Sequence, residues 1–412
     1  MKPIVQELID GYLLTWEDSQ ISIEVNRIKS HSDGSVKAEL VVQTTMNDCH
    51  PHLYQSMFNL LAERSRTSLA NTLKTKYPKA AWPIILEQLC VNVLSRVRAG
   101  EGMEELITGD DVKRPEYLMK PLVVKYMPNI IFGDRSTAKS LTAQIISSIM
   151  LLPWQDNPLK WHSPDRMVKT LWLDWETDRD TVLWQLYRIQ NGMDLPALSI
   201  QYLRMSATLT QAVESVQRYL TESQAEVVVF DSLSLACAGD LKESGPAALF
   251  WQAIRKIKTF KNEPITSLIL AHTSKEQSQH KTVVGSFMFE AQARNIWECR
   301  KNDHSEEAID VAMFHRKPPP TDRIYKPIGY RATFTEETIS FVPENPRELR
   351  VFSDSLSRHD QIADALRNGS LKLEEIAEVI EATVPVVRTT LYRGKDTFLK
   401  TENGEWGLKY VP

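Results

Sequence analysis

The stretch of sequence that decides the fold reads Asn129-Ile130-Ile131-Phe132-Gly133-Asp134-Arg135-Ser136-Thr137-Ala138-Lys139-Ser140 and continues into Leu141-Thr142-Ala143-Gln144-Ile145-Ile146. The apolar residues before Gly133 predict a buried strand, and the pattern from Lys139 onward predicts a helix, with a loop between them. This loop reads G-x-x-x-x-A-K-S, which differs at one position from the phosphate-binding pattern G-x-x-x-x-G-K-[ST]. A chance match at a strand-to-helix turn is the alternative, and the strand–loop–helix context disfavours it.

The residue types of this loop suit a nucleoside triphosphate with Mg²⁺, because N–H groups at a helix N-terminus bind phosphate oxygens. The residues predicted to bind ATP are Gly133, Asp134, Arg135, Ser136, Thr137, Ala138, Lys139 and Ser140. Lys139 would place a positive charge at the β- and γ-phosphates, and the Ser140 hydroxyl could ligate the metal. Ala138 replaces a glycine, which costs little in a helical conformation but about 1–2 kcal/mol at positive φ. A degenerate loop that does not hydrolyse ATP therefore stays open.

A second predicted strand, Glu226–Phe230, ends in Asp231. In a nucleotide-binding fold this is the Walker B position, where an Asp binds Mg²⁺ through water. Strands also end in Asp because Asp favours turns. The phosphate loop elsewhere in the chain favours the functional interpretation, so Ser140 and Asp231 are the predicted metal-binding residues.

A third predicted strand, Thr170–Leu173, ends in the acids Asp174 and Glu176. If its strand neighbours the phosphate loop, Glu176 can orient and deprotonate an attacking water molecule. The alternative is structural: Asp174 or Thr177 would cap the helix expected over Asp178–Gln190.

Length and composition limit the number of domains and the class of protein. Its 412 residues suggest about three domains, and 42% apolar residues with a net charge of −4 indicate a globular protein and exclude a histone-like polycation. A local basic channel for nucleic acid remains compatible with this charge. The N-terminus lacks a signal-peptide core, and no apolar run approaches the roughly 18 residues of a membrane span. We therefore expect a cytoplasmic protein with no membrane partner.

The chain divides into three predicted domains. Residues 1–115 carry a hairpin over residues 21–45 and a helical pattern from His52 to Arg98, which indicates an α+β domain without a recognisable motif. Residues 116–350 alternate strands and helices, which predicts a mostly parallel sheet covered by helices on both faces. Later strands near residues 308–314, 330–334 and 338–342 suggest an added antiparallel meander.

Residues 356–412 form the third predicted domain, with helices at 360–367, 372–380 and 384–393 followed by a hairpin around Asn403-Gly404. Because Asn-Gly favours a tight type I′ turn, Leu399 and Thr401 should lie opposite Trp406 and Leu408. This order predicts a winged helix-turn-helix. Its third helix offers Arg388 and Arg393 to DNA. The segment holds eight basic and nine acidic residues, so a protein-interaction module is the alternative.

The order of these motifs resembles the RecA/DnaB-type ATPases, and in particular the RepA-type hexameric replicative helicases. A phosphate loop is followed by strands ending in Glu176, Asp231 and His272. The other stretches that carry the resemblance are Ser244-Gly245-Pro246-Ala247, Leu268 to Lys275, Val284-Gly285-Ser286 followed by Arg294, Phe314-His315-Arg316-Lys317, and Lys326-Pro327-Ile328-Gly329-Tyr330. The resemblance covers about residues 115–345 and implies a RecA-like fold.

The resemblance implies a role for each catalytic candidate. Lys139 and Ser140 would hold phosphates and metal, and Glu176 would be the general base beside the metal-binding Asp231. His272 would sense the γ-phosphate, and Arg294 would reach the nucleotide of a neighbouring subunit. Without the family, His272 is equally a hydrogen-bonded residue at a strand end, and Arg294 a salt-bridge residue. The implied partners are further copies of the chain, with a hexamer as the expected size.

Two loops would face the pore of such a ring, over residues 235–243 and 274–282. Lys275 and Lys281 in the second loop would give a ring of six a positive channel for single-stranded DNA. A solvated surface loop is the alternative. The sequence thus predicts an ATP-driven, ring-forming DNA helicase or translocase acting on single-stranded DNA in replication or a related mobile-element process, with partner proteins from such a process. An ATP-controlled DNA-binding or partner-recruiting regulator and a recombinase-like filament former are the alternatives.

Overall fold

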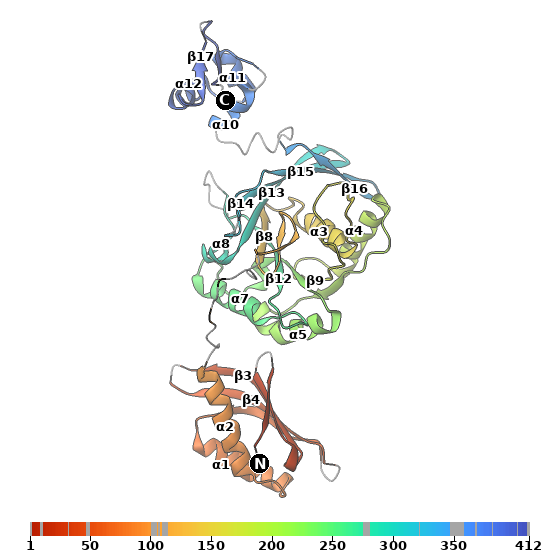
Figure 1. The fold of residues 1–412 in the computed structure, drawn as a ribbon, viewed down its shortest axis with the longest axis vertical. Helices are drawn as coiled ribbons and strands as arrows, with labels where there is room; N and C mark the ends of the chain where they lie inside the picture. Colours follow the sequence, from red (N-terminus) through yellow and green to blue (C-terminus); the bar gives the residue numbers. More distant parts are fainter. Residues whose placement is uncertain are drawn as a thin grey trace. The chain divides into compact units, whose positions relative to one another are not determined.

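The structure is a computed structural model that describes residues 2–8, 11–31, 33–46, 50–99, 105, 108, 114–274, 281–320, 322–346, 358–366, 369–380, 382–401 and 403–409. The chain forms two compact units, one of residues 1–113 with 212–219, the other of residues 114–211 with 220–412. Figure 1 labels the helices and strands of both.

The N-terminal residues form a five-stranded antiparallel sheet whose strands lie in chain order. Its elements are β1 (Ile4–Leu8), β2 (Gly11–Trp16), the 3-10 turn η1 (Glu17–Ser19), β3 (Ile21–Ser30), β4 (Val36–Thr44), β5 (His52–Asn59), α1 (Glu63–Lys76) and α2 (Trp82–Ala99). Alternate residues of β3 and β4 are buried, as the hairpin pattern predicted. Together with residues of α1 and α2 they form one apolar core.

The helical pattern predicted from His52 is wrong for its first residues, because His52–Asn59 is strand β5. β5 pairs with β4, and the register shifts where Val42 faces Tyr54 while Gln43 faces His52. This shift leaves Leu53 as an extra residue and lets both Leu53 and Phe58 enter the core. The bulge thus removes the two-residue alternation by which a strand is recognised.

The second unit contains a nine-stranded sheet with the order β10-β9-β11-β12-β8-β13-β14-β15-β16. The strands are β8 (Pro128–Gly133), β9 (Thr170–Asp174), β10 (Gln201–Arg204), β11 (Val227–Asp231), β12 (Thr266–His272), β13 (Asn295–Ser305), β14 (Ala308–Lys317), β15 (Ile328–Phe334) and β16 (Ile339–Glu344). The strands from β10 to β13 in this order are parallel, and β14 to β16 form an antiparallel meander. The predicted α/β class and the meander are both confirmed. A small hairpin of β6 (Tyr117–Met119) and β7 (Val123–Val124) precedes β8.

Helices cover both faces of this sheet, as predicted. The helices of this unit are α3 (Lys139–Leu151), α4 (Arg179–Gly192), α6 (Leu233–Ala236), α7 (Ser244–Lys256) and α8 (Met288–Gln292), while α5 (Leu209–Ser223) is divided between the two units. α3 and α4 pack with Trp172, Val229 and Trp297 on one face, and α3 buries every residue except Ser140. On the other face the Phe230 ring lies 5.9 Å from Phe250 of α7. Residues 229 and 230 point to opposite faces because side chains alternate along a strand.

The last part of the chain contains α10 (Arg358–Ala365), α11 (Leu373–Val379), α12 (Val384–Arg393), β17 (Phe398–Lys400) and β18 (Trp406–Leu408), with a core of its own. The predicted hairpin register is wrong by one residue, because Phe398 and Lys400 lie opposite Leu408 and Trp406. The Thr401 N–H donates to the Glu405 carbonyl oxygen at 2.7 Å, so the turn is longer than a two-residue Asn-Gly turn. The slip buries Phe398 rather than Leu399.

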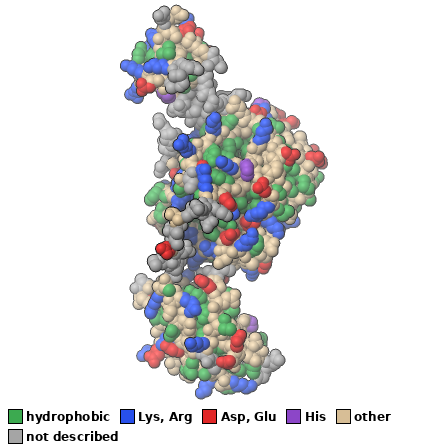
Figure 2. Space-filling model, viewed as in Figure 1, with side chains coloured by type: hydrophobic (Ala, Val, Ile, Leu, Met, Phe, Trp, Pro, Cys, Tyr) green, Lys and Arg blue, Asp and Glu red, His purple; other side chains and the backbone are tan. Residues whose placement is uncertain are grey.

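Basic and acidic side chains are interspersed over the face drawn in Figure 2. Within the part of the chain that the structure describes, no helix is long and apolar enough to cross a membrane.

Candidate active site

A cavity of about 350 Å³ opens where the parallel strands end, beside the loop that joins β8 to α3. Residues 136–141 line it together with Glu176, Asp231 and His272, which come from the ends of β9, β11 and β12. Parallel strands place their carboxyl ends at one edge of a sheet, where α/β proteins bind ligands. The structure therefore brings four predicted catalytic residues together, including Lys139, and leaves Arg294 outside.

The backbone of the phosphate loop is tightly constrained. A Cβ atom at Gly133 would lie 2.2 Å from the Cys299 carbonyl oxygen on β13, so only glycine fits. Ser136 and Ala138 are left-handed, with φ of 59° and 62°. Of the two conformations that the sequence left open for Ala138, the structure has the costly one, worth about 1–2 kcal/mol.

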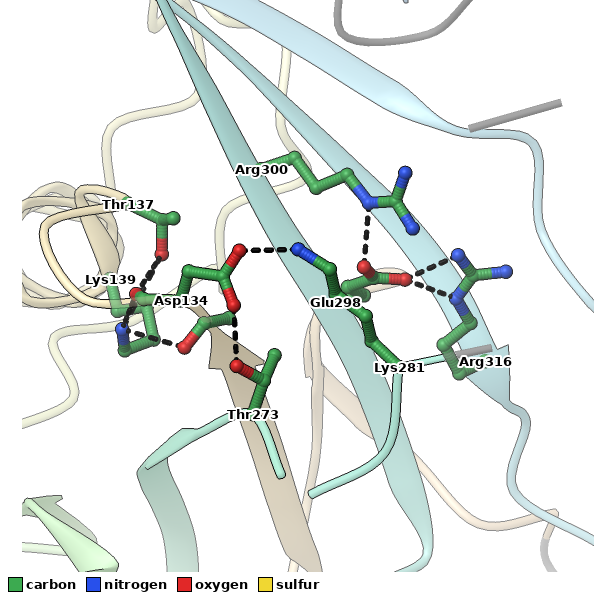
Figure 3. A network of polar contacts seen from close by, with 9 residues as sticks. Asp134, Thr137, Lys139, Thr273, Lys281, Glu298, Arg300 and Arg316 are labelled. Carbon is green, nitrogen blue, oxygen red and sulfur yellow. Dashed lines mark hydrogen bonds and ion pairs between the residues drawn. The ribbon is translucent and has the colours of Figure 1, made fainter. Parts of the chain in front are cut away.

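Lys139 points back onto its own loop (Figure 3). Its Nζ donates to the carbonyl oxygens of Gly133 at 3.1 Å and Asp134 at 2.6 Å, and the side chain is buried. Burial lowers the pKa of Lys139, and the negative charges of Glu176 and Asp231 oppose that shift. The buried ammonium group is thus hydrogen-bonded to the backbone of the loop that is predicted to bind phosphate.

Asp231 and Ser140 meet at the metal position that the sequence predicted. The Ser140 hydroxyl donates a hydrogen bond to the Asp231 carboxylate. Burial raises the pKa of Asp231 to about 7, against the effect of the Ser140 hydrogen bond, and the charge of Glu176 raises it further. A carboxylate and a hydroxyl are oxygen ligands of the kind that Mg²⁺ takes together with substrate phosphates. The residues present therefore fit the predicted metal.

β9 does not neighbour β8, since β11 and β12 lie between the two strands. Glu176, which follows β9, nevertheless lies next to Ser140 and Asp231 in the cavity. The Ser232 hydroxyl donates to the Glu176 Oε1 atom, and His272 Nε2 lies 3.2 Å from the same oxygen. His272 Nδ1 is buried and has no hydrogen-bond partner among the described residues. A carboxylate held in this way can orient a water molecule at the end of a bound triphosphate.

The capping alternative for Asp174 and Thr177 is wrong, because Asp178 caps α4 and accepts from the Thr181 N–H at 2.9 Å. Asp174 is fully buried, and its carboxylate accepts from the backbone N–H groups of Glu176 at 2.8 Å and Thr177 at 2.9 Å. Asp174 therefore shapes the turn that presents Glu176 to the cavity. The sequence could not separate the two roles, since both use an Asp after a strand.

The phosphate loop is tied to the end of β12 through Asp134 (Figure 3). The Thr273 hydroxyl and the Lys281 ammonium group both contact the Asp134 carboxylate. Burial alone would raise the pKa of Asp134, but these contacts lower it. Lys281, one of two predicted pore lysines, is thus paired with the loop, while Lys275 lies outside the described residues.

Arg294 lies at the opposite end of the parallel strands, where β8 starts. Its backbone N–H donates to the Pro128 carbonyl oxygen at 2.9 Å, at the start of β8, whereas Gly133 ends that strand. Pro128 and Gly133 are five residue steps apart along β8, a distance of roughly 16 Å. The Arg294 guanidinium donates to the Ala291 carbonyl oxygen, and no described carboxylate pairs with it. The salt-bridge interpretation thus finds no partner in the described part of the chain.

The remaining DNA-binding candidates, Arg388 and Arg393, are exposed on α12. Sequence reasoning missed a second group of cavity residues. They are Gln185, Arg188, Lys301, Ile309, Phe334 and Ile339. These residues come from α4 and the strands β13 to β16, and no local motif marks them.

Residues 106–278 of the chain match a protein family described as an AAA domain. The chain carries a P-loop ATPase domain. The match includes the phosphate loop, Glu176, Asp231 and His272, and it ends before β13, so Arg294 and the meander lie beyond it. No curated protein matches the chain.

Proposed function

We propose that this chain is an ATP-driven, ring-forming DNA helicase or translocase that acts on single-stranded DNA in replication or a related mobile-element process. The observation that carries the proposal is the convergence of Lys139, Glu176, Asp231 and His272 on one cavity, from the ends of four different strands or loops. Their order along the chain is the order found in RecA/DnaB-type ATPases. This convergence supports hydrolysis of ATP rather than binding alone.

In the proposed reaction the triphosphate lies on residues 133–140, and Lys139 transfers its hydrogen bonds from the loop carbonyls to the phosphates. Ser140 and Asp231 would hold Mg²⁺, which would supply positive charge against the developing charge on the phosphates. Glu176 orients the attacking water and accepts its proton. His272 contacts Glu176, so the presence of the γ-phosphate alters the end of β12.

The proposed link to DNA runs from β12 into the next loop. Thr273 and Lys281 flank that loop, and both contact Asp134 of the phosphate loop. A DNA phosphate competes with Asp134 for Lys281, which frees Asp134 and loosens the phosphate loop. DNA binding and ATP turnover are coupled through this ion pair.

The proposed ring uses Arg294 in trans. Because Arg294 lies at the sheet edge away from its own cavity, it can serve only a nucleotide held by another subunit. An arginine supplied in this way raises turnover by roughly 10³–10⁵. We propose a homo-oligomer, with a hexamer as the favoured size.

The last three helices and the hairpin are proposed to be a winged helix-turn-helix, with Arg388 and Arg393 on the exposed side of its third helix. A second candidate function is an ATP-controlled regulator that recruits DNA or proteins without unwinding. The left-handed Ala138 favours this candidate, because a strained phosphate loop can bind nucleotide yet hydrolyse it slowly.

ATP turnover with and without single-stranded DNA tests the proposal, together with separation of a forked duplex. We expect DNA to raise turnover, the duplex to be separated, and Lys139→Ala to lower turnover at least about 100-fold. Lys74→Ala, on the exposed side of α1, is the matched control and should leave turnover unchanged. Turnover unaffected by DNA and by Lys139→Ala would contradict the motor. ATP-dependent DNA binding without strand separation would favour the regulator.

A further inference from the structure

A second cavity, of about 640 Å³, lies at the opposite end of the meander from the phosphate loop. The start of β15 and the end of β16 line it, whereas the end of β15 and the start of β16 line the candidate active site. Residues 326–329, part of a stretch that resembles related ATPases, belong to its wall and take no part in the proposed reaction. We call this cavity the lysine groove, after Lys120, Lys160 and Lys326, which line it.

The charge of the lysine groove is positive and uncompensated. Lys120, Lys160 and Lys326 are exposed, and no described carboxylate forms an ion pair with any of them. Glu344 is the one acidic residue among the described residues of the lining, and it pairs with Arg331 at 3.1 Å. The three ammonium groups therefore repel one another, and an anionic ligand would offset that repulsion.

Tyr325 lies among the lysines and is held in place from below. Its backbone N–H donates to His315 Nδ1 at 2.9 Å, and the centres of the two rings are 5.5 Å apart. His315 is itself buried and stacked on Trp297, with 4.4 Å between the ring centres. Lys120 Nζ lies 5.9 Å from the centre of the Tyr325 ring, and the neighbouring Ile324 is 66% exposed. A half-buried ring that is already fixed beside a cation loses little entropy when a ligand packs on it.

Lys160 is held at the groove by a turn with a left-handed backbone. Its φ is 56°, a conformation that glycine adopts at lower cost. The buried Asn157 fixes the turn, because its Oδ1 accepts from the Trp161 N–H at 3.1 Å and its Nδ2 donates to the Trp161 carbonyl oxygen at 2.7 Å. Backbone that is kept strained by its surroundings is concentrated at functional sites. The turn thus supports a binding role for the groove that its charge and its aromatic ring indicate independently.

We propose that the lysine groove binds single-stranded nucleic acid, with phosphates on its three lysines and a base against Tyr325. Sites that bind single strands without sequence preference combine a basic groove with aromatic side chains on which bases stack. An acidic protein segment is the alternative ligand, but lysine is depleted at protein interfaces. The groove is separate from Lys281 of the proposed motor, since Lys281 contacts the phosphate loop at the other end of the sheet.

Fluorescence anisotropy of a labelled thymidine oligonucleotide tests the proposal on the full chain, without ATP and over a range of salt concentrations. We expect the triple variant Lys120→Ala, Lys160→Ala, Lys326→Ala to bind more weakly. Its plot of log affinity against log salt should be shallower by about 2, because each phosphate contact on a single strand contributes about 0.7 to the slope. The matched control removes three exposed lysines outside the groove and should leave the slope unchanged: Lys29→Ala, Lys74→Ala, Lys261→Ala.

The role of the ring is tested separately with the same oligonucleotide. Tyr325→Ala should weaken binding about tenfold at an unchanged salt slope, the typical loss for one stacked base. Tyr325→Phe keeps the ring and should restore the affinity. Phe260→Ala is the matched control, because Phe260 is 38% exposed and lies 5.2 Å from the Lys261 ammonium, outside the groove. A loss for Tyr325→Phe as large as that for Tyr325→Ala would contradict stacking.

Two further results would overturn the proposal. The first is a salt slope that the triple variant leaves unchanged, or that the control variant lowers equally. The second comes from poly-glutamate, an anion without bases: binding as tight as that of the oligonucleotide, with the same loss in the triple variant, would assign the groove to an acidic protein segment. Because ATP is absent from these measurements, a chain without ATP turnover would refute the motor and leave the test of the groove intact.

Discussion

The cavity beside the phosphate loop has two parts whose surfaces differ in energetic character. The phosphate end contains a left-handed Ala138, a buried Lys139 and a buried Asp231, and each of these costs folding free energy. The other part is lined by Ile309, Phe334 and Ile339, and we call it the apolar end. It extends the main core, where Phe334 packs on buried residues. A triphosphate with its metal would offset the buried charges, whereas a ligand group at the apolar end would only cover apolar surface. Substitutions that remove a buried charge or strain at the phosphate end should therefore raise the unfolding free energy, whereas removing apolar side chains at the apolar end should lower it.

The largest effect is expected from Glu176→Gln, which should lower ATP turnover by about 10²–10⁴ because the base that activates water is lost. Nucleotide affinity should change little, since the amide keeps the shape and the Ser232 contact. Single-turnover kinetics and equilibrium binding separate the two quantities. Glu307→Gln, exposed in the turn before β14, is the control. A parallel loss of affinity and turnover would make Glu176 a structural residue.

Asp231→Asn should raise the unfolding free energy of the chain without ligand, by up to about 4 kcal/mol at pH 8. The pKa of Asp231 is raised to about 7 in the folded chain, from 3.8, so the folded state binds this proton more tightly. The unfolding free energy of the wild type thus falls as pH rises from about 4 to about 7. Asn has no charge, so the variant does not lose this stability. Urea unfolding at pH 8 and pH 4 measures the difference, which should vanish at the lower pH. Destabilisation at pH 8 would show that the carboxylate is favourably held.

The same group should make metal binding depend on pH. Mg²⁺ needs the ionised Asp231, so in the presence of ATP its affinity should fall by up to about tenfold per pH unit below pH 7. Affinity should level off above pH 8, where Asp231 is ionised. Calorimetric titration of Mg²⁺ between pH 6 and pH 8 follows this change, with Asp231→Asn as the comparison. A flat profile in the wild type would assign the metal to other ligands.

The smallest effect is expected from Ala138→Gly, which should stabilise the chain by at most about 1 kcal/mol. Glycine removes the left-handed penalty but gains freedom in the unfolded chain, and the two effects partly cancel. Ala143→Gly, inside α3, should instead destabilise by about 1 kcal/mol, because its backbone is helical. Thermal unfolding of the two variants shows whether each change raises or lowers the stability of the chain. Equal destabilisation would mean that the loop is not strained at Ala138.

The phosphate end could be predicted from the sequence because its residues are consecutive and lie in a strand–loop–helix context. The strands that end in Glu176 and Asp231 were likewise visible as apolar runs followed by an acid. The apolar end could not be predicted, since Arg188 and Phe334 meet only when α4 packs on β16, far along the chain.

Local errors had local causes. The bulge at Leu53 hid strand β5, and the longer turn before Glu405 shifted the last hairpin by one residue. Asp174 has a side chain that serves as a helix cap or as the anchor of a turn, and the sequence alone does not distinguish these uses. The deciding contacts are short in sequence for Asp174 and for the last hairpin, but a residue pattern does not show which of two possible local contacts forms.

A structure of the chain with Mg²⁺ and a non-hydrolysable ATP analogue tests the central claim most directly. We expect the triphosphate on residues 133–140 with Lys139 turned onto it, and the metal between Ser140 and Asp231. A nucleotide bound outside this cavity, or phosphates out of reach of Lys139, would contradict the account.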